Sequence, residues 1–114
     1  MNYIIYTSNA DRLKEEILDR VSEKLDVNGN RIATWDCVET DEDDVVLVHT
    51  AEQWAEKGCI QLTPMIGLEE LQVRFHYWDD YEEQTNDDDK YMLGRLTELL
   101  LVHFKYFVDK IVIE

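Results

Sequence analysis

The pattern of apolar and polar residues divides the chain into short segments, and the first is an apolar run at residues 2–7. In an extended strand both faces of this run would carry large side chains, which predicts a strand inside a sheet. A four-residue spacing of apolar positions follows, formed by Leu13, Ile17, Val21 and Leu25. This spacing predicts a helix with one buried face, capped by Ser8 or Asn9. It runs to about Asp26 and closes at the Asn-Gly-Asn sequence of residues 28–30.

The rest of the chain shows strand-like stretches separated by turn residues. They predict five further strands, at residues 31–38, 44–50, 59–63, 70–78 and 110–113. In the fourth of these, Val73, Phe75 and Tyr77 alternate with polar residues, as in an antiparallel strand with one face in solvent. A short helical turn is expected at residues 51–57, where Gly58 would close it.

A second long helix is predicted from residues 86–89 to about Phe107, and between Leu99 and Phe104 it is apolar nearly all round. Such a segment is buried on more than one side, either within one chain or between two copies. A homodimer through the helix at 90–107, with a structural role, is therefore one hypothesis. The order of elements predicts a single α+β domain over residues 1–114. We expect a two-layer sandwich of a mainly antiparallel sheet with two long helices on one face, similar to a ferredoxin-like split βαβ with an extra hairpin.

The composition adds one feature to this picture, a large negative net charge. The chain has 114 residues, with 26 acidic against 11 basic side chains and a formal net charge of -15, while 45 % of its residues are hydrophobic. That apolar fraction argues against disorder, and the charge argues against nucleic acid and anionic membranes as partners. The N-terminus has no basic region that would indicate a signal peptide, so a cytoplasmic location is expected, with Cys37 and Cys59 as free thiols.

The negative charge is concentrated in the middle of the chain. Residues 39–89 hold sixteen acids and only two bases. Most of these acids fall in two groups: the first acidic run is Glu39 and Asp41–Asp44, and the second acidic run is Asp79, Asp80, Glu82, Glu83 and Asp87–Asp89. If the strands alternate in direction, the two runs lie at opposite ends of the sheet. Neither run has the spacing of an EF-hand loop, so no metal site is predicted.

The second acidic run is flanked by aromatic side chains, a combination that suits binding of a cationic partner. The candidate partner-binding residues are Trp78, Asp79, Asp80, Tyr81, Glu82 and Glu83. The leading hypothesis is a small binding or inhibitor-type protein that engages a basic protein and has no catalytic activity. The simpler interpretation is a pair of solvated loops that keep the protein soluble, with Asp87–Asp89 also favouring the start of a helix.

Arg74 and His76 support an alternative, a small enzyme or ligand-binding domain that uses the polar face of the strand at 70–78. An Arg–His pair could bind a carboxylate or phosphate. His49 and His103 fall at apolar positions and are expected to be structural. Asp36 lies inside the predicted strand at 31–38 and is the one acid placed for the apolar setting that raises the pKa of a carboxyl group. No nucleophile, phosphate-loop or metalloprotease motif occurs, so no catalytic residue and no cofactor is predicted.

Overall fold

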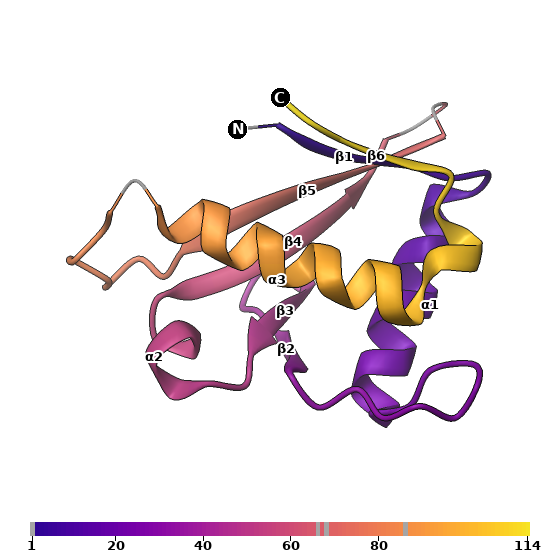
Figure 1. The fold of residues 1–114 in the computed structure, drawn as a ribbon. Helices are drawn as coiled ribbons and strands as arrows, with labels where there is room; N and C mark the ends of the chain where they lie inside the picture. Colours follow the sequence, from indigo (N-terminus) through magenta and orange to yellow (C-terminus); the bar gives the residue numbers. More distant parts are fainter. Residues whose placement is uncertain (1, 66, 68, 86) are drawn as a thin grey trace.

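The computed structural model describes residues 2–65, 67, 69–85 and 87–114 (Figure 1). Six strands form one antiparallel sheet in the order β2-β3-β4-β5-β1-β6. Their bounds are β1 (Tyr3–Tyr6), β2 (Trp35–Glu39), β3 (Val45–His49), β4 (Gly58–Pro64), β5 (Glu70–Tyr77) and β6 (Lys110–Ile113). The central position of β1 agrees with its apolar residues on both faces.

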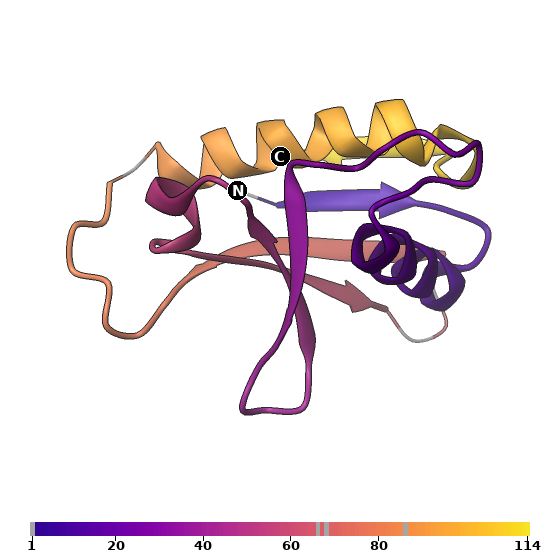
Figure 2. The same cartoon turned by 90° about the horizontal axis from the view of Figure 1, so that it is seen from below.

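In the described residues, three α-helices complete the fold: α1 (Ala10–Glu23), the short α2 (Glu52–Ala55) and α3 (Asp88–His103), followed by a 3₁₀ turn, η1 (Lys105–Phe107). Figure 2 shows α3 along one side of the sheet, with the β2–β3 hairpin extending away from it. Both long helices pack against the same face of the sheet. The strand side chains of this core include Tyr3, Ile5, Leu47, Ile60, Leu62 and Val73, and its helix side chains include Leu13, Ile17, Val21, Met92, Leu96 and Leu100.

The predicted two-layer α+β fold is confirmed. β5 lies between β4 and β1, and the β2–β3 hairpin extends the sheet beyond β4. The finer comparison with a ferredoxin-like arrangement rests on strand order alone and stays a prediction. No helix in the described ranges is both long enough and apolar enough to cross a bilayer.

The predicted end of the first helix and start of the second strand are wrong by a few residues. Helix α1 ends at Glu23 because Lys24 takes a left-handed conformation, with φ 64°, and its N–H bonds the carbonyl of Val21. The chain then turns back on the helix end, where the Ile32 N–H bonds the Lys24 carbonyl at 2.8 Å. Residues 31–34 are therefore held against α1, and pairing with β3 begins only at Trp35.

The second long helix also ends earlier than predicted. Helix α3 stops at His103, and η1 replaces its expected last turn. Thr7 fixes this turn to β1 by donating a hydrogen bond from its hydroxyl to the Phe107 carbonyl at 2.6 Å. The apolar segment of α3 is buried on one side only, since Leu101 and Val102 are 59 % and 65 % exposed.

The other face of the sheet, the open face, carries the side chains that alternate with the core. Val46, Val48 and Cys59 form a small buried cluster there, against which Ala55 and Trp78 pack. Gln61 on β4 and His76 on β5 lie beside this cluster, because the pairing of β4 with β5 sets Cys59 opposite His76. The open face therefore has an apolar centre with polar groups beside it.

Candidate functional site

The loop between β5 and α3 carries the second acidic run, and its two ends are tied together by one buried carboxylate. Asp88 Oδ1 accepts a hydrogen bond from Lys57 Nζ at 3.2 Å. Asp88 Oδ2 accepts from the Tyr77 hydroxyl at 2.8 Å and from the Thr85 N–H at 3.3 Å. Burial acts to raise the pKa of Asp88, but the Tyr77 and Lys57 donors outweigh it and leave that pKa below its ordinary value. The carboxylate is thus ionised and fixes the base of the loop.

Aromatic rings fill the inner side of the same loop. The rings of Tyr77 and Tyr81 stack with centroids 5.7 Å apart. Lys57 Nζ lies 5.2 Å from the ring centroids of both Tyr81 and Trp54, a cation–π arrangement. The Trp78 N–H bonds the Lys57 carbonyl at 2.9 Å. These contacts order the loop from inside, so that its acidic side chains point to solvent.

The predicted partner-binding residues divide into two kinds. Asp79, Asp80, Glu82 and Glu83 are exposed, and within the described part of the chain none of them forms an ion pair. Trp78 and Tyr81 are half-buried. Trp78 donates its indole N–H to the Ala55 carbonyl at 2.8 Å and covers part of the open face. Four carboxylates without a counter-charge therefore stand beside a fixed aromatic surface.

A hollow of about 510 Å³ lies on the open face beside Trp78. We call it the open-face hollow. Three groups of residues line it. They are the strand residues Val38, Glu39, Val46, Cys59, Gln61, His76 and Tyr77, the β2–β3 turn residues Thr40, Asp41, Glu42 and Asp44, and the loop residues Trp78 and Asp79. Antiparallel pairing does send the two acidic runs toward opposite ends of the strands, as expected. Members of both runs nevertheless border this single hollow, which the sequence did not indicate.

A chain of hydrogen bonds crosses the hollow. The His76 Nε2 and Gln61 Oε1 atoms are 2.9 Å apart, and Gln61 Nε2 donates to Asp44 Oδ2 at 3.1 Å. Lys14 from α1 donates to the other oxygen of Asp44 at 3.1 Å. Partial burial acts to raise the pKa of Asp44, but the Gln61 and Lys14 hydrogen bonds outweigh it, and the pKa is lowered. Asp44 is thereby fixed as a carboxylate at the edge of the hollow.

The two residues of the alternative site border different depressions of the open face. Arg74 and His76 share the open face, but the hollow that His76 lines does not include Arg74. Arg74 is exposed and instead lines a small depression with Asn2 and Gln72. Asp36 is exposed and pairs with Lys24, so it lacks the apolar setting expected from the sequence.

The other two histidines lie in the helix-covered layer. His49 is buried, accepts a hydrogen bond from the Ala51 N–H at its Nδ1 atom and packs edge-on against Trp35. Burial, followed by the positive charge of Arg95, lowers its pKa, so the ring is neutral. His103 pairs with Asp26, a contact between residues that are far apart in the sequence. Neither histidine faces the open-face hollow.

Comparison with protein-family models, with curated proteins and with solved structures finds no match for this chain. The site is therefore interpreted from its own geometry. Within residues 2–65, 67, 69–85 and 87–114, no group of three His, Cys, Asp or Glu side chains is arranged to hold a metal ion. The site can offer carboxylates to a cationic group of a partner, and an apolar surface to the atoms beside that group.

Sequence reasoning missed two contributors to this site. Asp88 belongs to a run of three aspartates, and only its burial distinguishes it from Asp87 and Asp89. The β2–β3 turn was expected to be remote from Trp78. The sequence held a partial signal for such a pair. Lys57, which pairs with Asp88 in the structure, is one of only two bases between residues 39 and 89.

The two thiols provide a direct check of the open face. Both are free, and they lie on opposite faces of the sheet, since Cys37 Sγ contacts the Leu18 carbonyl of α1 whereas Cys59 faces the hollow. Burial, with the charge of Asp44 adding to it, raises the pKa of Cys59 from 9.0 to about 11. At pH 8 we expect Cys59 to react with iodoacetamide about a hundredfold more slowly than free cysteine.

A Cys37→Ser variant isolates Cys59 for this measurement, and mass spectrometry follows the alkylation. The same variant in denaturant serves as the control and should react at the rate of free cysteine. Equal rates in the folded and denatured protein would contradict the burial of Cys59.

Proposed function

We propose that this chain is a small binding protein of inhibitor type that engages a basic protein partner through Trp78–Glu83 and the open-face hollow, without catalysis of its own. The observation that supports the proposal is the set of four exposed carboxylates at Asp79, Asp80, Glu82 and Glu83. They project from a loop whose base is fixed by Asp88. A loop that is already ordered loses less conformational entropy on binding.

The open-face hollow adds a second element to the proposed surface. Its centre is apolar at Val46 and Cys59, and its borders carry carboxylates from both acidic runs. Lysine and arginine side chains have the matching form, an apolar stem with a charged end. A basic segment could bury its stems against the open face while its charges meet Asp41, Glu42 and Asp79.

A cytoplasmic location belongs to the same proposal. Cys37 and Cys59 stay unpaired on opposite faces of the sheet. A protein with no disulfide and a solvent-accessible hollow lined by a thiol suits a reducing compartment.

Pull-down experiments at low salt and at about 0.5 M salt test the proposal, because an electrostatic complex weakens as the Debye length falls to about 5 Å or less. A recovered basic protein should then bind at least tenfold more weakly to a variant in which Asp79, Asp80, Glu82 and Glu83 become Asn and Gln. The matched control neutralises four α1 acids and changes the net charge equally: Asp11, Glu15, Asp19 and Glu23.

The proposal fails if no basic protein is recovered at low salt. It also fails if the loop variant and the α1 variant bind the recovered protein equally, because net charge alone would then explain the complex.

A second candidate function, a homodimer through the helix at 90–107, is favoured by one observation. Leu101, Val102 and Tyr106 are exposed around the end of α3, and Tyr106 is 76 % exposed. Light scattering at micromolar concentration tests it. We expect twice the chain mass if this surface associates, and a strict monomer would exclude this function.

A further inference from the structure

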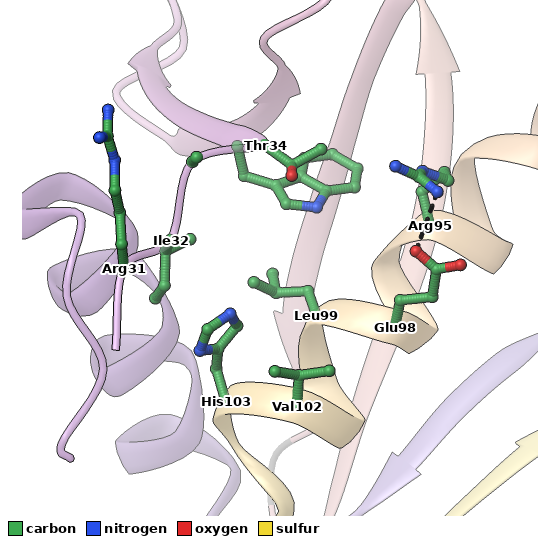
Figure 3. A pocket seen from close by; sticks show the side chains of 10 residues that line it. Arg31, Ile32, Thr34, Arg95, Glu98, Leu99, Val102 and His103 are labelled. Carbon is green, nitrogen blue, oxygen red and sulfur yellow. Dashed lines mark ion pairs between the residues drawn. The ribbon is translucent and has the colours of Figure 1, made fainter. Parts of the chain in front are cut away.

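A second cavity lies between α3 and the segment that follows α1, away from the acidic surfaces. It has a volume of about 210 Å³ and is lined by residues 31–35 and by α3 side chains (Figure 3). We call it the α3 pocket. Its charged lining reverses the balance of the molecule, because two bases, Arg31 and Arg95, are present with a single acid, Glu98. The whole chain has 26 acids and 11 bases.

Arg95 lines this pocket and is paired with Glu98. Its Nη1 atom donates to Glu98 Oε2 at 2.9 Å, which Figure 3 shows as a dashed line. Its Nε atom is buried and has no hydrogen-bond partner among the described residues. A buried guanidinium N–H without an acceptor is costly, so Arg95 keeps hydrogen-bonding capacity that its described neighbours do not satisfy.

His103 is held in one orientation by a buried carboxylate. Asp26 is only 3 % exposed, and its Oδ2 atom lies 2.7 Å from His103 Nδ1. Asp26 Oδ1 also accepts from the N–H groups of Asn28 and Asn30. The hydrogen bond from His103, opposed by burial and helped by these N–H groups, lowers the pKa of Asp26 to about 2. Because the carboxylate holds Nδ1, the other ring nitrogen of His103 faces away from Asp26.

Apolar side chains form the rest of the pocket. Figure 3 shows Ile32, Leu99 and His103 directed toward one another in its centre, with Arg31 on one side and Arg95 on the other. The volume is below the range of about 300–1,000 Å³ that accommodates drug-sized molecules. The pocket therefore suits a small molecule with an apolar body and a negative charge.

We propose that the α3 pocket binds the carboxylate of a small organic acid. Arg95 contacts the carboxylate, since a guanidinium matches the two oxygens of that group. Arg31, on the other side of the pocket, adds positive charge. Ile32, Leu99 and Val102 contact the apolar body. This binding site is separate from the open-face hollow and does not depend on the proposed function.

Benzoate is the probe, and the indole N–H signals in a ¹⁵N–¹H NMR spectrum are the readout. Of the three tryptophans, Trp35 lines the α3 pocket, whereas Trp54 and Trp78 do not. We expect benzoate to shift the Trp35 indole signal with saturation and to leave the other two signals in place. Trp54→Phe and Trp78→Phe variants assign the three signals by elimination.

Charge and shape are tested with two further probes. Benzamide, which has the same ring without the charge, should bind at least tenfold more weakly than benzoate. Inorganic phosphate should also bind more weakly, because it offers nothing to Ile32 and Leu99. Equal binding of benzamide would overturn the role of the carboxylate, and equal or tighter binding of phosphate would overturn the assignment of an organic acid.

Variants locate the binding energy. Arg95→Met should weaken benzoate binding about tenfold to a hundredfold. Because Arg95 is half-buried, the exposed Arg31→Met gives a second variant that retains the fold, and we expect a severalfold loss. Arg12→Met on the exposed side of α1 is the control and should bind as the parent does. The proposal is overturned if Arg31→Met and Arg12→Met bind alike, or if about 10 mM benzoate gives no saturable shift.

Discussion

Replacing Gly58 with alanine should destabilise the protein by about 3 kcal/mol or prevent it from folding. A Cβ atom at this position would lie 2.0 Å from the carbonyl oxygen of His76 and 2.9 Å from the Cα atom of Tyr77. Both contacts are with backbone, so no side-chain movement relieves them. The first residue of β4 would have to move away from β5. Urea unfolding followed by circular dichroism measures the change in the free energy of unfolding.

Gly94→Ala is the matched control, because it makes the same chemical change where space is free. Gly94 lies inside α3, and a Cβ atom there meets nothing within 4 Å. Alanine costs less conformational entropy than glycine in a helix, so this variant should be more stable by about 0.5–1 kcal/mol. Equal unfolding midpoints for Gly58→Ala and the parent would contradict the close approach of β4 to β5.

Replacing Asp88 with alanine should destabilise the fold by about 3 kcal/mol. The substitution removes the carboxylate acceptor of Lys57 and of the Thr85 N–H, and it leaves the Tyr77 hydroxyl with the Thr85 carbonyl alone. The Lys57 side chain is only 18 % exposed, so water does not fully replace the lost carboxylate. We expect the loop segment at 78–85 to lose its order together with this stability, which hydrogen exchange of its amides would detect.

Asp87→Ala is the control for Asp88→Ala. The Asp87 side chain is 89 % exposed and lies 3.8 Å from Lys90, so its loss should change the free energy of unfolding by less than about 0.5 kcal/mol. If the two variants have the same stability, Asp88 does not anchor the loop.

The same carboxylate determines a dependence on pH. The pKa of Asp88 is lowered from 3.8 in the folded protein, so the unfolded chain binds a proton more readily. Its contribution to stability is therefore complete above pH 3.8 and is lost as pH falls through the folded pKa. Asp26, with a pKa of about 2, acts in the same direction. The free energy of unfolding should decrease between about pH 4 and pH 2, and less steeply in Asp88→Ala than in the parent.

The regular elements could be predicted because their burial follows simple periods. In α1 the four-residue spacing of Leu13, Ile17 and Val21 matches the buried face, and β5 keeps its alternation. The predicted element boundaries are wrong where this regular spacing of apolar residues stops. Lys24 ends α1 with a left-handed backbone although it is not glycine, and its side chain pairs with Asp36 across the turn. Local helix propensity cannot predict that contact, because the contact forms only in the folded chain.

The site was less predictable because it depends on contacts between distant segments. The acids at 79–83 were identified from sequence, since exposed charge next to aromatic residues is a local signal. The open-face hollow requires the β2–β3 turn and Trp78 to border the same surface. Similarly, His103 was expected to be structural, but its partner Asp26 comes from the other half of the chain. Strand pairing brings the first pair of segments together, and the packing of α1 and α3 on one face brings the second pair together. Neither arrangement is determined by a single segment of the sequence.

The central position of β1 also sets the order in which this sheet can form during synthesis. β1 is made first, yet both strands that pair with it, β5 and β6, come from the second half of the chain. At the usual rates of translation, β5 is completed on the order of several seconds after Tyr3 and Ile5 have been added to the chain. During that interval a strand destined for the core has no native partner on the ribosome. Until then, the backbone groups of β1 lack the strands that pair with them in the finished sheet.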